Sequence, residues 1–154
     1  MIHAEHTIAI RAPIADVFAA ATDPWRAPEW NPGVVEITDF SGYPIGEGTT
    51  WNQMTMLAGR LMTLRARVQR YDAPREGVIE ISGDQRGRVW TRCRREGDVT
   101  IVTNGIEVEP PGGLVGRLAG PMIHGVMARE LAHSMERQRE TLEREARTGG
   151  SGTA

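Results

Sequence analysis

The hydrophobic pattern is clearest near the C-terminal end of the chain, over residues 121–147. On a wheel of about 3.6 residues per turn, one side of this stretch collects Ile123, Met127, Leu131, Ser134, Met135, Gln138 and Leu142, with His124 at its edge. Charged residues occupy the rest of the wheel. The pattern predicts one long amphipathic helix whose apolar side needs a sheet to cover it. Residues 114–119 predict a preceding helical turn or two, and Pro121 predicts a kink because proline removes a backbone donor.

Upstream of this helix, short segments that read as strands are separated by turn residues. The predicted strands are residues 3–11, 34–40, 49–57, 60–71, 78–82, 88–94 and 99–109. Two short helices are predicted after the first strand, at residues 14–22 and 25–30. The hairpin-sized spacing of the later strands favours antiparallel pairing.

These elements predict an α+β helix-grip fold, in which a curved seven-stranded antiparallel sheet wraps around the long C-terminal helix. A single helix cannot touch all of such a sheet. The space between them is either filled by the short helices and large side chains or left as a cavity, and function is expected there.

Composition narrows the function classes. The 154 residues are 40% hydrophobic with a net charge of -2, which gives no broad electrostatic case for nucleic acid. No apolar run approaches the ~20 residues of a membrane span, and the first residues do not resemble a signal peptide. Cys93 is the only cysteine, so a disulfide framework is absent and a cytoplasmic location is expected. The chain has no lysine, which excludes Schiff-base catalysis.

Marks spread along nearly the whole chain resemble a known superfamily. They are Ile10, Pro13, Val17, Phe18, residues 22–24 (TDP), Trp30, Pro32, Gly46, Gly48, Gly59, Val68, residues 71–74 (YDAP), residues 111–114 (PGGL), residues 116–118 (GRL), Leu142 and Glu143. In these residues the chain resembles the START-like, Bet v 1-like proteins, in the branch of polyketide cyclases, dehydrases and lipid transport. The resemblance implies a single START-like domain over residues 1–147. Residues 148–154 are rich in Gly and Ser and predict a disordered tail.

Alternation along the strands indicates which side chains face the helix. Met62, Leu64, Ala66 and Val68 alternate with polar residues and should point inward, as should Thr100, Val102, Asn104, Ile106 and Val108. Both faces of residues 49–57 are semi-apolar, so alternation leaves open whether Trp51 or Met54 points inward. Arg88, Trp90, Arg92 and Arg94 share one face of their strand. Either this face is solvated and Cys93 points inward, or Arg92 is an interior cation beside Trp90.

The expected ligand-binding residues are Trp30, Trp51, Met54, Met62, Leu64, Trp90, Val102, Asn104, His124, Met127, Leu131 and Met135. Methionine adapts to irregular apolar shapes, so this lining favours a bulky hydrophobic ligand. Most of these residues are equally compatible with plain core packing. His124 is either a partly buried helix residue or a general base that titrates near neutral pH. No group of side chains has metal-ligand spacing, and no cofactor is expected.

Three functions remain open at this stage. The first is binding of a hydrophobic or polycyclic small molecule, such as a polyketide, steroid or lipid, for transport, sequestration or sensing. The second, implied by the resemblance, is an aromatic polyketide cyclase or dehydratase that uses Arg92, Asn104 and His124. The third is a regulator of a partner protein whose cavity is closed by its own side chains.

Overall fold

The computed structural model describes residues 1–57, 59–110 and 112–152. Its strands are β1 (Ile2–Ile10), β2 (Val34–Thr38), β3 (Thr50–Leu57), β4 (Arg60–Asp72), β5 (Glu76–Gly83), β6 (Gly87–Glu96) and β7 (Val99–Val108). Its helices are α1 (Ile14–Ala21), the 3₁₀ helix η1 (Pro24–Arg26), α2 (Ala27–Trp30) and α3 (Gly113–Gly152). The second predicted short helix is therefore η1 followed directly by α2, and the other elements follow the predicted order.

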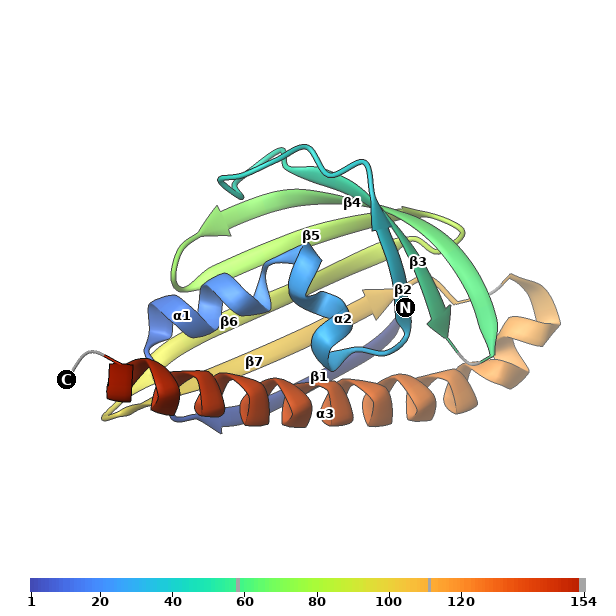
Figure 1. Cartoon of the computed structure of the whole chain (residues 1–154). Helices are drawn as coiled ribbons and strands as arrows, with labels where there is room; N and C mark the ends of the chain where they lie inside the picture. The colour runs from blue at the N-terminus through green and yellow to red at the C-terminus, as the bar shows by residue number, and fades with distance from the viewer. Residues whose placement is uncertain (58, 111, 153–154) are drawn as a thin grey trace.

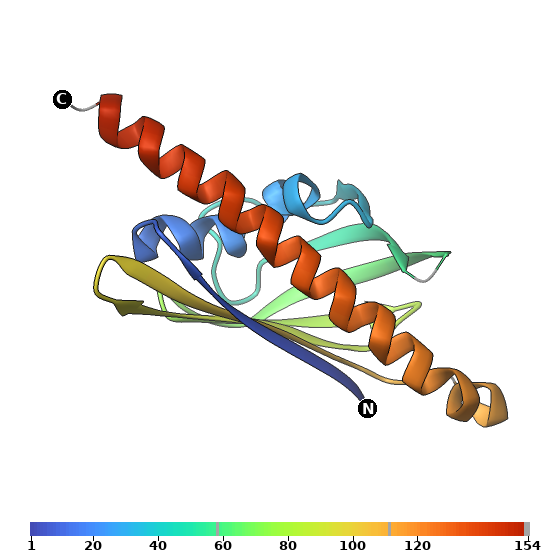
Figure 2. The same cartoon turned by 90° about the horizontal axis from the view of Figure 1, so that it is seen from below.

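Within the described residues, the seven strands form one antiparallel sheet in the order β1-β7-β6-β5-β4-β3-β2. Figure 1 shows this sheet arching over α1 and α2, with α3 running along its open side. In the view of Figure 2, α3 crosses the sheet from end to end. The predicted α+β helix-grip fold is confirmed.

The alternating sequence of β4 produces its two faces. Met62, Leu64, Ala66 and Val68 are buried, and the polar residues between them are exposed. A bulge shifts the register between Val68 and Arg70. Because a bulge adds one residue to one strand, the inward parity passes to Tyr71, whose ring lies 5.2 Å from that of Phe18.

Helix α3 packs mainly against β1 and also contacts α2. Its first turns lie at an angle to the rest of the helix in Figures 1 and 2, in the region that contains Pro121. The helix extends to Gly152, into the stretch 148–154 for which the sequence predicts a disordered tail. Residues 153–154 lie outside the described residues.

Buried side chains form three clusters along the side of the sheet that faces α3. One joins β1, α1, β6 and β7 to Met135 and Leu142 of α3. The second lies around Trp51 and Val68, and the third joins the Ile2–Val108 end of the β1–β7 pair to Met127. Among the described helices, none is long and apolar enough to cross a lipid bilayer.

Candidate functional site

The sheet has an inner face, which we define as the side that carries Cys93 and Val102. Both pack in one buried cluster with Met135 of α3, so this side faces the helix. The strand registers extend the inner face across the sheet: Val102 pairs with Cys93, Val68 with Ile79, and Trp51 with Ala66. The alternate residues form the outer face.

Several expected ligand-binding residues lie on this inner face. Trp51, Met62, Leu64, Val102 and Asn104 come from the strands. Met127, Leu131 and Met135 approach from α3, and Trp30 joins the cluster that contains Val102 and Met135 from α2. The structure thus collects strand and helix residues that are far apart in the sequence.

Other inner-face side chains are only half-buried although they point toward the helix. They are Gln53, Thr55, Leu57, Ile79, Ile81, Val89, Asn104 and Ile106. A side chain that points inward and keeps accessible surface has a space of at least water size beside it. These inner-face positions are therefore less completely covered by other side chains than the buried clusters are.

A polar row crosses this face near its centre. The registers align His6 of β1 with Asn104 of β7, and Asn104 with Thr91 of β6. Thr91 is buried, and the Oδ1 atom of Asn104 is buried without a hydrogen-bond partner among the described residues. An unpaired buried polar atom costs about 1–3 kcal/mol, so this oxygen is available to a ligand donor.

Gln138 adds a second polar group from α3. It follows Met135 and precedes Leu142 on the side of the helix that packs into the core, and it is only 2% exposed. Its Oε1 atom also lacks a hydrogen-bond partner among the described residues. The amide can accept a bond through oxygen and donate through nitrogen, so it suits hydroxyl and carbonyl groups alike.

Trp90 and Arg92 lie on the outer face, as one of the two interpretations of their strand predicted, and so lie away from the other expected ligand-binding residues. The Trp90 Nε1 atom donates to Glu5 Oε2 at 2.9 Å, and the Arg92 guanidinium lies 5.9 Å from the ring centre. Arg92 Nε also donates to Glu76 at 3.1 Å. The ring covers Gly105 on the neighbouring strand, where a Cβ atom would overlap it. The Trp90 ring is shielded from water by these neighbours, whereas the arginine head groups remain in contact with water. The face can therefore lie on the outside of the sheet.

Two more expected site residues lie away from the inner face. Met54 occupies the outer face of β3, because the pairing of Trp51 with Ala66 places Trp51 and Gln53 inside. His124 is exposed on α3. The helical pattern places it at the edge of the apolar stripe, but α3 packs mainly against β1, which leaves that edge uncovered.

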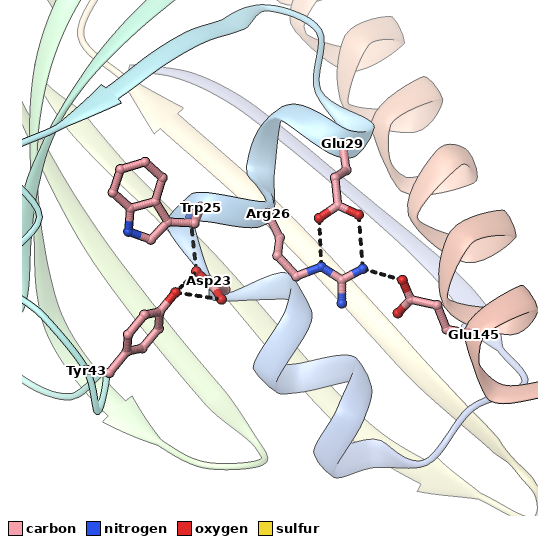
Figure 3. Close-up of polar contacts among 6 residues, drawn as sticks. All are labelled: Asp23, Trp25, Arg26, Glu29, Tyr43 and Glu145. Carbon is pink, nitrogen blue, oxygen red and sulfur yellow. Dashed lines mark hydrogen bonds and ion pairs between the residues drawn. The ribbon is translucent and has the colours of Figure 1, made fainter. Parts of the chain in front are cut away.

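An ion-pair network beside Trp30 joins Arg26 and Glu29 of the short helices to Glu145 of α3; Figure 3 shows these three charged residues. The Arg26 guanidinium donates to Glu29 at 2.8 and 3.1 Å and to Glu145 at 2.7 Å, and it lies 5.2 Å from the centre of the Trp30 ring. The bond from Arg26 lowers the pKa of Glu29 below 4.5, and the bond to Glu29 raises the pKa of Arg26. These contacts fasten α2 against the C-terminal half of α3.

Asp23 organises the turn that leads into η1, as Figure 3 also shows. Its Oδ1 atom accepts from the backbone N–H of Trp25 at 3.0 Å and from the Tyr43 hydroxyl at 3.0 Å. A surface pocket of about 420 Å³ lies beside this network and is lined by small residues of α1 and α3 together with Asp16, Asp23 and Glu145. It is separate from the inner face, and the sequence pattern did not indicate it.

Cys93 is a buried inner-face thiol, as one of the two interpretations of its strand predicted. Burial raises its pKa from 9.0 to about 12, so it is protonated at neutral pH and acts as a small apolar group. Within the described residues, no group of His, Cys, Asp or Glu side chains is arranged to hold a metal ion.

Sequence reasoning did not identify Gln138, His6, Thr91 and Gln53 as site residues. A signal for Gln138 existed, since it is a polar residue inside the apolar stripe of the long helix. His6 shares the parity of the buried Ile8 and Ile10. The other two became visible only through strand registers.

The chain was compared with protein-family models and with curated protein sequences. The family model described as polyketide cyclase / dehydrase and lipid transport matches residues 1–143. A search of curated protein sequences finds no match to the chain.

Solved structures share the fold at low sequence identity. The protein TTHA0849 from Thermus thermophilus superposes with a TM-score of 0.79 at 15% identity, covering 91% of this chain and 96% of that one. The Zhui aromatase/cyclase from Streptomyces sp. R1128 has a TM-score of 0.77 at 17% identity, with 96% and 97% covered. A START superfamily protein from Mycobacterium smegmatis has a TM-score of 0.68 at 20% identity, with 91% and 98% covered.

Proposed function

Because the chain belongs to the polyketide cyclase / dehydrase and lipid transport family, we propose that it binds a hydrophobic or polycyclic small molecule between the inner face of the sheet and α3. The observation that carries the proposal is the half-buried state of inner-face residues such as Ile79, Ile81 and Val89. Side chains that face the helix but keep accessible surface leave room for a ligand beside them.

The lining favours a large apolar ligand with a few polar groups. Trp51, Met62, Leu64 and Leu131 supply aromatic, thioether and aliphatic surface. Asn104 and Gln138 supply two buried oxygens without partners among the described residues. Small-molecule sites are typically apolar with a small number of placed polar groups, which is the composition found here.

The inner face favours binding without turnover. Between the strand ends, its described positions carry no carboxylate or guanidinium; Arg60 and Arg95 have inward parity but are exposed at the ends of their strands. His6 is the one ionisable side chain of the polar row. A carrier, sequestering or sensing role fits this scarcity of acid–base groups.

Calorimetric titration with aromatic polyketides, steroids and fatty acids tests the proposal. Ile81→Trp fills the space from the inner face, and we expect it to weaken binding at least about tenfold, or ~1.4 kcal/mol. Ser82→Trp places the same side chain on the outer face and should leave affinity unchanged. Affinity no tighter than about millimolar for every compound would contradict the proposal and favour a partner-protein regulator.

A second candidate is an aromatic polyketide cyclase or dehydratase, favoured by the similarity to the Zhui aromatase/cyclase over most of both chains. In such a reaction the site would hold a poly-β-ketone folded, and the Asn104 amide would donate to a carbonyl on which negative charge develops. Arg92 and His124 lie outside the inner face and are not needed for this step.

Product analysis with a poly-β-ketone substrate separates the two candidates. Asn104→Ala should lower the rate of cyclisation about a hundredfold, while Arg92→Ala, on the outer face, should retain it. If the wild-type protein binds the ligand but forms no cyclised product, the result supports the carrier role and contradicts the enzymatic one.

A further inference from the structure

The start of α3 exposes a row of large apolar side chains that the fold does not use. Leu114, Leu118 and Met122 are 72%, 76% and 66% exposed. Leu114 and Leu118 are four residues apart and lie on one side of the first turns, and Met122 follows four residues later, just after Pro121. Ile123 and Met127 face the other way and pack against the third buried cluster, so the exposed row contributes nothing to the core.

Charge is segregated along the same helix. Residues 110–129 contain Arg117 and Arg129 but no Asp or Glu, although the whole protein has a net charge of -2. Both arginines are exposed, and neither forms an ion pair with a described residue. Arg129 follows Met122 by seven residues and therefore lies on the same side of the helix as Met122. Carboxylates begin at Glu130 and recur throughout the second half of the helix.

The β3–β4 hairpin lies at the same end of the molecule. Met56 and Leu61 form a cross-strand pair near its tip and are 45% and 46% exposed. Figures 1 and 2 both show this end of the hairpin on the side where α3 begins, with the first turns of α3 projecting beyond the sheet. One end of the protein thus presents apolar side chains on two elements together with unpaired positive charge.

We propose that this end docks onto an anionic lipid bilayer, with Leu114, Leu118 and Met122 in the headgroup region and Arg117 and Arg129 against the lipid phosphates. Cationic amphipathic helices with exposed apolar faces bind in this manner. A second copy of the chain is a poorer occupant, because a two-fold contact would place this carboxylate-free cationic segment against itself. The docking does not depend on a ligand in the inner face.

Sedimentation with phosphatidylglycerol and phosphatidylcholine vesicles tests the proposal on the full chain. We expect binding to the anionic vesicles that weakens as salt rises. The double variant Leu114→Gln/Leu118→Gln should lower the partition coefficient at least about tenfold, because it removes the inserted apolar surface. Arg117→Gln/Arg129→Gln should lower it about fivefold for each arginine, and only on anionic vesicles.

Matched controls keep these outcomes interpretable. Trp25→Gln removes an exposed apolar side chain from η1 (50% exposed), and Arg137→Gln removes an exposed charge from the second half of α3. Both should bind as the wild type does, and thermal melts should show all variants folded. The proposal is overturned if the wild-type protein does not bind anionic vesicles, or if all variants bind them equally well. A dimer in ultracentrifugation that only the leucine variant dissolves, without vesicle binding, would assign the surface to a second copy instead.

Discussion

Replacing Gln138 by leucine should stabilise the protein and weaken its ligand binding at the same time. The Gln138 side chain is 2% exposed, and its Oε1 atom has no partner among the described residues. Leaving such an atom unpaired costs about 1–3 kcal/mol, and leucine has a helix propensity close to that of glutamine. We therefore expect the free energy of unfolding to rise by about that amount. Each kcal/mol should raise Tm by about 2–4 °C in a chain of this length.

The two effects are separated by pairing denaturant unfolding with calorimetric titration of the ligand. If Gln138 is retained for ligand binding, its replacement should raise the free energy of unfolding and lower the affinity for the ligand. Arg137→Leu is the matched control, since it changes an exposed neighbour and should shift stability by less than about 0.5 kcal/mol. If Gln138→Leu destabilises the protein by several kcal/mol, the amide is paired in the native state and the reasoning is refuted.

Three further predictions follow from the packing and the pKa shifts. Gly105→Ala should lower the free energy of unfolding by about 1–3 kcal/mol, because its Cβ atom would overlap the Trp90 ring; urea unfolding measures this. The pKa of Glu29 is lowered in the folded state by Arg26, so the stability from this pair is present above pH 4.5 and is lost as the pH falls further. Arg26→Gln should flatten that part of a stability–pH curve. The pKa of Cys93 is raised from 9.0 to about 12, so stability should fall as the pH rises through that interval, and a thiol reagent at pH 8 should label only unfolded protein.

Controls for these predictions are available in the same chain. Gly125→Ala lies in α3 where a Cβ atom meets nothing within 4 Å, so it should stabilise the helix by about 0.5–1 kcal/mol. Glu145→Gln removes only the contact from Arg26 to α3 and should leave the acid dependence that belongs to Glu29. Unchanged stability in Gly105→Ala would show that Trp90 moves aside at little cost.

Local patterns predicted the fold because the hydrophobic periodicity of the helices and strands extends over many residues. The alternation of β4 predicted its buried set, Met62 to Val68, without any knowledge of its neighbours. In β7 the same reasoning placed Val102 and Asn104 on one face. The stripe of α3 likewise predicted the buried Met127, Met135 and Leu142. Element ends were less exact, since β5 begins at Glu76 and the sequence predicts its start at residue 78.

The candidate site was predicted only in part, because the alternation of side chains along a strand shows which residues share a face but not which face is inside. It places Trp90 and Arg92 on one face without showing whether that face points toward the helix. Neighbouring residues determine which face is outside: Gly105 leaves room for the Trp90 ring on the outer face, and Glu5 and Glu76 form ion pairs with Arg92 there. Trp51 was placed inside rather than Met54 by the pairing of β3 with β4.

The sequence alone therefore determined the order of the elements and the helix-grip fold class, because apolar periodicity and turn residues act within a few positions of the chain. Tertiary structure alone decided which inner-face side chains remain half-buried, and that the Asn104 Oδ1 and Gln138 Oε1 atoms lack partners among the described residues. Both properties depend on how closely α3 approaches strands that lie far from it in the sequence, and no local pattern encodes that distance.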